Sequence, residues 1–406
     1  MATKLTSFKP DPTSATATSA TATTEKYLKS QIITYMGNKR KLLTQIGDIV
    51  DLVKYELGCQ RLKTADAFAG SGIVSRLLKN KSDVLLTNDI SSYSKTLNHC
   101  YLSTPSANIK QNIKKYIMDA NKFVDNVTSM DCNIPKWIQL HWAPTSETQI
   151  TKDDRVFFTA ENGRRIDKYR YYINTYVPNE FQHFLLANLL VKCSIHNNTN
   201  GQFSAFYKDE RGIGKYGGKK EIDIKRIITP IQLEMPIFSP NSCNVRIYQE
   251  DTNSWVKKIE SVDLIYLDPP YNKHPYSIYY FMLDIINNWN TNDKIPDTNR
   301  GQPKNWRKSD YNSFTKAESA FRQLIHNIKA KYILLSYNNK GIIPINTIEQ
   351  ILETRGKLYK FPLTHKTYNK LKGIATYKRK VAWDDVKEYL WLVKCDVINV
   401  GNTTTC

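Results

Sequence analysis

The sequence predicts an α/β fold, in which a doubly wound parallel sheet carries an inserted second domain. Two observations predict the sheet: short apolar runs that end in small or polar residues, and helix-like stretches between some of these runs. A third observation, the long interval between the second and third runs, predicts the insertion. With 406 residues, the chain is long enough for two such units.

The predicted strands are four short runs with the composition of buried strands. They are Thr64–Phe68, Val84–Thr87, Val262–Leu267 and Tyr332–Ser336. Helical periodicity is present at Gly72–Lys79 and at Tyr279–Trp289. Strands that alternate with helices are typical of a doubly wound sheet. Two later runs, Ile374–Val381 and Val386–Val393, flank a short polar turn and predict an antiparallel hairpin.

The chain divides into four predicted parts. Residues 1–28 are rich in Thr, Ser and Ala and predict a disordered tail, because they hold little apolar surface to bury. The two halves of the sheet domain are expected at residues 29–109 and 255–406, the second of which includes the hairpin. Residues 110–254 differ in composition, with two Trp and a Tyr-rich segment, and predict the inserted domain.

Composition narrows the classes of function. The 58 Lys and Arg against 38 Asp and Glu give a net charge of +20, which attracts polyanions, chiefly nucleic acid or an anionic membrane surface. A basic protein from a Lys-rich proteome is the alternative. The sequence has neither an apolar stretch of about 18 residues nor a signal-peptide pattern, so we expect no membrane association and no secretion. The seven cysteines form no C-x-x-C pair, and we expect no metal site.

The first candidate ligand site is a glycine turn, Asp66-Ala67-Phe68-Ala69-Gly70-Ser71-Gly72, between a strand and a helix. Glycines let a ligand approach the backbone, and the helix N-terminus faces it. Asp89 follows the next strand, where an acid can accept both hydroxyls of a ribose. Because G-x-G-x-x-G is lacking, a mononucleoside-type cofactor is favoured over a dinucleotide. A plain strand–turn–helix is the alternative for this segment alone.

The second candidate site is Asp268-Pro269-Pro270-Tyr271, directly after the run Val262–Leu267. An amine conjugated with an aromatic ring is a poor nucleophile. An aspartate oxygen and a backbone carbonyl that accept its N–H groups draw the nitrogen toward sp3 character and expose its lone pair. The prolines stiffen the loop, and Tyr271 offers a flat face on which a base can stack. A proline-rich turn without function is the alternative.

The two motifs together resemble those of S-adenosylmethionine-dependent DNA adenine-N6 methyltransferases. A third motif, Tyr35-Met36-Gly37-Asn38-Lys39-Arg40-Lys41, precedes the glycine turn and is similar to the N-terminal cofactor motif of the Dam-like, alpha-type group. There an aromatic residue packs on the cofactor and a lysine four positions later lies in the same pocket, as Tyr35 and Lys39 would here. Asp66 stands where the family often has Glu.

This resemblance implies a Rossmann-like methyltransferase sheet with a target-recognition insert, and methyl transfer to N6 of an adenine flipped out of duplex DNA. The catalytic residues would be Asp268, Pro269, Pro270 and Tyr271. The residues expected to bind S-adenosyl-L-methionine are Tyr35, Lys39, Asp66, Phe68, Gly70, Ser71, Gly72, Asp89 and Asp268. The segments Glu161–Asp167, Phe206–Lys208 and Gly212–Gly218 also resemble parts of the group.

Double-stranded DNA is the expected partner, and a cluster of cations near the hairpin is expected to contact its phosphates. These cations are Lys366, Lys370, Lys372, Lys378, Arg379 and Lys380. The resemblance further implies action as a monomer on DNA, a cognate restriction endonuclease as a possible companion, and an intracellular location, in a bacterial cytoplasm or a virus-infected host cell.

Two other functions remain open at this point. An RNA adenine methyltransferase of the same fold would share the chemistry, although a large recognition insert favours duplex DNA. A non-catalytic DNA-binding subunit would not need the intact Asp268–Tyr271 and glycine-turn motifs. A cytosine-C5 methyltransferase is disfavoured because no Pro-Cys dipeptide is present, and a zinc deaminase because C-x-x-C is absent. Asp268 disfavours the related enzymes that carry Ser or Asn at this position.

Overall fold

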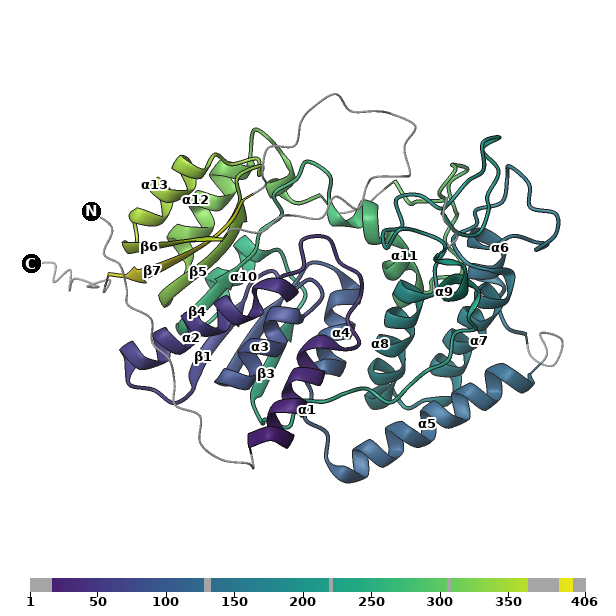
Figure 1. Ribbon diagram of the computed structural model, residues 1–406, viewed down its shortest axis with the longest axis horizontal. Helices are drawn as coiled ribbons and strands as arrows, with labels where there is room; N and C mark the ends of the chain where they lie inside the picture. Colours follow the sequence, from purple (N-terminus) through teal and green to yellow (C-terminus); the bar gives the residue numbers. More distant parts are fainter. Residues whose placement is uncertain (1–16, 128–132, 219–221, 305–307, 364–386, 397–406) are drawn as a thin grey trace, which may run out of the picture.

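The computed structural model describes residues 17–127, 133–218, 222–304, 308–363 and 387–396. Within them, seven strands form one sheet in the order β3-β2-β1-β4-β5-β7-β6 (Figure 1). The strands are β1 (Leu62–Asp66), β2 (Ser82–Asn88), β3 (Asn244–Tyr248), β4 (Val262–Leu267), β5 (Ala330–Asn338), β6 (Gly356–Leu363) and β7 (Glu388–Cys395). Neighbouring strands from β3 to β5 are parallel, whereas β7 is antiparallel to both β5 and β6.

The four predicted strands are present as β1, β2, β4 and β5, and β4 has the predicted bounds. Both faces of the sheet are buried. Successive side chains of a strand point to opposite faces, so neighbouring residues pack in different cores. On β4, Leu264 packs in one core and Ile265 in the other. On β5, Leu334 and Ile333 divide in the same way. The near-continuous apolar runs in the sequence reflect this two-sided burial.

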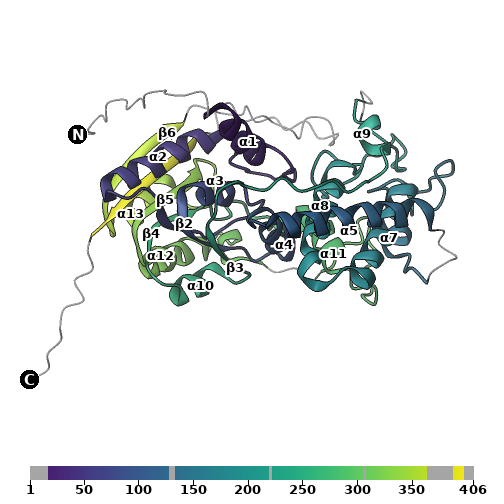
Figure 2. The same ribbon diagram turned by 90° about the horizontal axis from the view of Figure 1, so that it is seen from below.

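Helices cover both faces of the sheet and confirm the doubly wound architecture (Figure 2). On one face lie α2 (Leu43–Leu57) and α3 (Ile73–Lys81). On the other lie α10 (Thr252–Lys258), α12 (Ala317–Asn327) and α13 (Ile345–Glu353). Helix α3 confirms the helix predicted after the glycine turn. No helix in the described ranges has the length and apolar character needed to cross a bilayer.

A helical unit lies beside the sheet, at the end away from α13 (Figure 1). Its helices are α5 (Ala107–Asn126), α6 (Trp137–Trp142), α7 (Ala160–Tyr176), α8 (Asn179–Ile195) and α9 (Ile224–Ile228). Its core is shared with α4 (Ser92–Tyr101) and α11 (Tyr276–Asn288), the second of which confirms the predicted helix near the Asp268 loop. Trp137 of α6 lines a cavity together with residues at the ends of the strands, so this cavity has walls from both units.

Three strands differ from the sequence prediction, among them β6, which the sequence did not indicate. Strand β3 lies inside the range 110–254 but pairs with β2, so the end of that range belongs to the sheet rather than to the insert. Its residues are half exposed, and the run is too polar to be recognised as a buried strand. Strand β7 matches the second arm of the predicted hairpin, but it lies between β5 and β6, and both of these strands pair with it in antiparallel fashion. The predicted first arm, Ile374–Val381, lies outside the described residues.

The N-terminal segment is more ordered than its composition predicts. Residues 17–29 form α1, which falls largely within the predicted tail of residues 1–28. The helix is anchored at its end, where Tyr27 is fully buried and donates a hydrogen bond of 2.7 Å to the carbonyl of Tyr101. Arg76 on α3 in turn donates to the carbonyls of Tyr27, Ser30 and Gln31. Two 3-10 helices complete the described elements, η1 (Arg40–Leu42) and η2 (Asp310–Asn312).

Candidate active site

A cavity of about 620 Å³ lies at the carboxyl ends of the central parallel strands. Asp66 is the last residue of β1, Asp89 follows β2, and Asp268 follows β4. Ligands of open α/β sheets bind at this edge, and the volume falls within the range of about 300–1,000 Å³ usual for ligand sites. The three motifs thus meet in one place. The predicted residues that line the cavity are Tyr35, Lys39, Asp66, Phe68, Gly70, Ser71, Asp89, Asp268 and Pro270.

The glycine turn has a backbone that only glycine adopts easily. Gly70 and Gly72 have φ values of 50° and 77°, in the left-handed region. A Cβ on Gly70 would lie 2.9 Å from the Tyr35 ring, and one on Gly72 would lie 2.6 Å from Oδ1 of Asn98. The turn therefore needs glycine both for its conformation and for close packing. Gly72 is the N-cap of α3 but does not line the cavity.

Asp89 is held by the turn that it faces. Its Oδ2 accepts the N–H of Gly70 at 2.8 Å, and its Oδ1 accepts the N–H of Ser91 at 2.8 Å. Burial raises the pKa of Asp89, although these backbone bonds lower it in part. Each oxygen keeps a further lone pair, so the carboxylate is fixed in orientation and can still accept two hydroxyl groups.

Asp66 is a buried carboxyl with one unused oxygen. Its Oδ2 accepts the hydroxyl of Ser75 at 2.6 Å, whereas its Oδ1 has no hydrogen-bond partner among the described residues. Burial raises the pKa of Asp66 to about 7, partly offset by the bond from Ser75. An unpaired buried acceptor on a cavity wall is costly unless a ligand satisfies it. The position therefore fits a donor group such as an ammonium.

Lys39 lies between two carboxylates that come from different strands. Its Nζ is 3.0 Å from Oδ1 of Asp268 and 2.9 Å from Oε1 of Glu388, and it donates to the carbonyl of Gly37 at 2.8 Å. The lysine side chain is only 2% exposed. Burial by itself would lower the pKa of Lys39, but the charge of Asp268, the Tyr271 phenol and the charge of Glu388 outweigh it, so the pKa lies well above its ordinary value.

Asp268 is a largely buried carboxyl group on the cavity wall that is paired with Lys39. Its Oδ1 lies 3.0 Å from Nζ of Lys39, and the side chain lines the cavity. Burial raises the pKa of Asp268 to about 6; the charge of Lys39 lowers it and that of Glu388 raises it. Near neutral pH the group is therefore ionised and able to accept a hydrogen bond from an amino group.

Aromatic rings form one wall. Tyr35 stacks on Tyr276, at a centroid distance of 5.0 Å, and on Tyr280, at 4.7 Å, and the last two rings lie 6.2 Å apart. The hydroxyl of Tyr280 accepts the N–H of Met36 at 2.6 Å, so the stack also fixes the segment that carries Lys39. Tyr35 and Tyr276 both line the cavity. The wall offers flat faces to a planar ligand.

Two members of the Asp268–Tyr271 motif lie behind the wall. Pro269 is buried, and Tyr271 is only 8% exposed; neither lines the cavity. The Tyr271 ring packs edge-on against Tyr337, with centroids 5.7 Å apart, and lies 5.5 Å from Nζ of Lys39. In this structure, Tyr276 rather than Tyr271 presents an aromatic face to the cavity. The stacking role of Tyr271 stays a prediction.

Comparison with known proteins identifies the family. The model of the D12 class N6 adenine-specific DNA methyltransferases matches residues 35–351, which include all three motifs and the helical unit between them.

The chain belongs to this family.

Curated relatives agree with this DNA adenine methyltransferase assignment. The type II methyltransferase M.NlaIII of Neisseria lactamica is 29% identical over 368 residues, which cover 89% of this chain and 98% of the relative. M.CviAII of Paramecium bursaria Chlorella virus 1 is 26% identical, with the same two coverages. M.FokI of Planomicrobium okeanokoites is 26% identical over 89% of this chain, which spans about half of that longer relative, 53% of its length.

The cavity of this methyltransferase also has walls that the sequence motifs did not indicate. The chain after β3 contributes Gln249, Asp251 and Thr252, and the segment around η2 contributes Ser309, Tyr311 and Asn312. Asp251 caps α10, where its side chain accepts the N–H of Ser254. An N-cap residue at this position was the sequence signal that could have indicated this part of the cavity wall. Glu388 was missed because it lies outside any motif and meets Lys39 only in the folded sheet.

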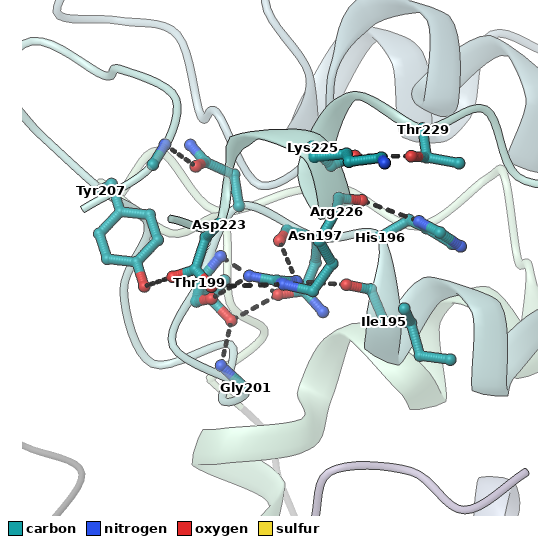
Figure 3. Close-up of polar contacts among 12 residues, drawn as sticks. Ile195, His196, Asn197, Thr199, Gly201, Tyr207, Asp223, Lys225, Arg226 and Thr229 are labelled. Atoms are coloured by element: carbon teal, nitrogen blue, oxygen red, sulfur yellow. Dashed lines mark hydrogen bonds and ion pairs between the residues drawn. The ribbon is translucent and has the colours of Figure 1, made fainter. Parts of the chain in front are cut away.

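The methyltransferase has a polar network in its helical unit (Figure 3). The guanidinium of Arg226 donates to three backbone carbonyls at and just after the end of α8, those of Ile195, Asn197 and Thr199. Asp223 lies 3.7 Å from Arg226 and accepts the hydroxyl of Tyr207 at 3.1 Å. The network joins α9 to the loop after α8 and to the segment Phe206–Lys208. It thereby fixes one of the segments that resemble the family. The six predicted DNA-binding cations, Lys366, Lys370, Lys372, Lys378, Arg379 and Lys380, lie outside the described residues.

Proposed function

We propose that this DNA adenine-N6 methyltransferase uses S-adenosyl-L-methionine and acts at a specific sequence on an adenine flipped out of duplex DNA. The observation that carries the proposal is the meeting of Asp66 and Asp268 at one cavity, where Oδ1 of Asp66 has no hydrogen-bond partner among the described residues and Asp268 is paired with Lys39. Both side chains line the same cavity. Asp66 fits a cofactor ammonium, and Asp268 fits the amino group of the target base.

The hydrogen-bond acceptors and rings that line the cavity fit S-adenosyl-L-methionine. Asp89 would accept the ribose hydroxyls, the Gly70 turn would allow the nucleoside to approach the backbone, and Asp66 would accept the ammonium. Tyr35 and Phe68 would contact the cofactor with their rings. When bound, this cofactor supplies a methyl group on a positively charged sulfur. The roles of Lys39, Ser71 and Gly72 would be to hold the walls of the pocket in place.

The chain would prepare the adenine for transfer in two ways. A carboxylate oxygen of Asp268 would accept one N6–H group, and the carbonyl of Pro269, after the same rearrangement of the motif loop that would bring Tyr271 to the base, would accept the other, which draws the nitrogen lone pair out of conjugation. Pro270 and an aromatic face, Tyr276 in this structure or Tyr271 after rearrangement, would hold the base plane. Since most of the required help is orientation and charge placement, no covalent intermediate is needed.

The basic character of the chain supports DNA as the substrate. The net charge of +20 and the six cations between residues 366 and 380 would contact phosphates in a sequence-independent manner. We expect the enzyme to act as a monomer on DNA. The relatives are named as type II methyltransferases and modification methylases, which favours a cognate restriction endonuclease as a partner in the same cell.

The experiment that tests the proposal uses the purified chain, cofactor tritiated at the methyl group, and either duplex DNA or RNA. We expect label in duplex DNA, recovered as N6-methyladenine, and none in RNA. Sequencing that reports methylated bases in DNA from expressing cells should place the modification at one motif. Label in RNA alone would support the RNA enzyme instead. An unlabelled duplex that is nevertheless bound would support a non-catalytic subunit.

A further inference from the structure

Lys39 is shared between two carboxylates, although the catalytic motif supplies only one. Asp268 comes from the loop after β4, and Glu388 is the first residue of β7. The two lie 3.0 Å and 2.9 Å from the same Nζ, and their side chains are 19% and 17% exposed. This cluster has one positive and two negative charges when all are ionised. It therefore carries a net negative charge beside the cavity.

Glu388 is held rigidly in this position. Its backbone lies in register between Asn338 of β5 and Leu363 of β6, so it belongs to the middle strand of three. Its Oε1 accepts the hydroxyl of Ser336 at 3.3 Å, which also comes from β5. The contact with Lys39 therefore arises from the sheet itself. A surface ion pair, by contrast, would be free to rearrange.

We propose that Glu388 is a positioning residue for methyl transfer, which acts through Lys39 to keep Asp268 a strong hydrogen-bond acceptor. The inference deepens the proposed function and rests on the role assigned there to Asp268. Glu388 itself does not line the cavity, so no direct contact with the substrate is required.

The physical reason is charge balance in a buried site. With Asp268 alone, Lys39 would form a one-to-one ion pair and would draw much of the negative charge of that carboxylate. With Glu388 present, the ammonium divides its attraction between two anions and a carbonyl. The residual negative charge lies where the adenine nitrogen becomes positive during methyl transfer. Fixed charge of this kind is most effective in a site that excludes water.

Several other ionisable groups lie close enough to Asp268 for their charges to interact with it. Besides Lys39 and Glu388, they are Asp66 on β1, Tyr266 on β4, Tyr271 in the motif loop and Tyr276 on α11. A fall in the methylation rate on the acid side of the pH profile (the acid limb) therefore reports on Asp268 together with these neighbours, and not on Asp268 alone. The charge of Glu388 raises the pKa of Asp268, so its removal should lower that pKa.

The test compares Glu388→Gln with wild type in single-turnover methylation, measured against pH at saturating cofactor and DNA. We expect a rate at neutral pH that is lower by roughly tenfold and an acid limb displaced to lower pH. The matched control is Glu349→Gln. Glu349 on α13 accepts the indole N–H of Trp391 at 3.0 Å and pairs with Lys360, so it supports β7 and β6 without contact to Lys39. The control should leave the acid limb in place.

A rate reduced equally at every pH, with an unmoved limb, would show that Glu388 is only structural and would overturn the inference. If Glu388→Gln does not fold, Glu388→Asp decides, because it retains the charge but withdraws it from Lys39. We expect a lower rate and a limb displaced in the same direction, and a wild-type profile would contradict us. Asp268→Ala separates the two proposals. Activity in that variant would refute the proposed function, whereas an inactive Asp268→Ala beside a wild-type Glu388→Gln would refute this inference alone.

Discussion

Three aspartates at one edge of the sheet have been placed in three different surroundings. Asp89 has both oxygens bonded to backbone N–H groups, Asp66 has one oxygen bonded to Ser75 and one without a partner among the described residues, and Asp268 is paired with the ammonium of Lys39. A carboxylate that is already oriented suits a neutral polyol, and one that lacks a donor suits an amine. The differences in partners, rather than the residue type, therefore distinguish a cofactor contact from a catalytic one.

Asp89→Ala should weaken cofactor binding far more than DNA binding. The carboxylate can accept two ribose hydroxyls, and loss of such charge-assisted bonds costs on the order of 2–3 kcal/mol. Calorimetric titration with S-adenosyl-L-methionine measures the effect. The control is Asp83→Ala on β2, the strand that Asp89 follows, where an exposed carboxylate pairs with Arg61 away from the cavity. An unchanged dissociation constant for Asp89→Ala would remove this residue from the cofactor site.

The methylation rate should fall as the pH drops through about 6. Burial raises the pKa of Asp268 to about 6, and the protonated acid can no longer accept the N6–H group. The ionised form predominates above that pH, so the rate should level off there. Single-turnover rates at saturating substrate measure the limb, and DNA binding measured in parallel should not show the same loss. A rate that stays constant down to about pH 5 would contradict the assigned role of Asp268.

At the scale of elements, the glycine turn connects β1 to α3 and is packed against the segment that carries Tyr35 and Lys39. The ring of Tyr35 covers Gly70, and Asn98 of α4 covers Gly72. The first motif, the glycine turn and the following helices are therefore packed as one unit. A change in the turn should be felt at the aromatic wall.

Gly70→Ala should damage cofactor binding beyond the cost of its backbone. Its positive φ alone costs an alanine about 1–2 kcal/mol of stability, but the new Cβ would also lie 2.9 Å from the Tyr35 ring. Gly58→Ala is the matched control, because Gly58 ends α2 with a φ of 64° and has open space around its Cβ. We expect similar losses in melting temperature for the two variants. Only Gly70→Ala should lose methylation rate, by up to about 10²-fold. Equal rates would contradict the close packing.

The elements differed in how far the sequence predicted them. Strand β4 and the loop at Asp268 were predictable, because a buried apolar run and a proline-rich motif can both be recognised from a few adjacent residues. Strand β3 was not, since it pairs on only one side and its residues are half exposed. Partner choice in the β5-β7-β6 region depends on residues far apart in the chain, so the partner of β7 was assigned wrongly. Glu388 depends on that pairing and was missed for the same reason.

At the scale of the whole molecule, the sheet and the helical unit both contribute walls to the cavity. The helical unit shares its core with α4 and α11, and α11 begins just after the Asp268 motif. Trp137 of α6 lines the cavity together with the ends of the strands. A base delivered to Asp268 must therefore enter between the sheet and the unit expected to read the DNA.

Neutralisation of Lys378, Arg379 and Lys380 together should weaken binding to target and non-target duplexes alike. Each phosphate contact releases about one counterion, so the slope of log affinity against log salt should become shallower by roughly 2–3 if all three cations meet phosphates. Neutralisation of Lys257, Lys258 and Lys329 is the control, since these exposed lysines carry the same total charge and lie shortly before β4 and β5, at the sheet edge opposite the cavity. An equal change in slope for both triple variants would mean that net charge alone matters. A loss confined to the target duplex would mean that the first three cations read bases, because phosphate contacts cannot distinguish one sequence from another.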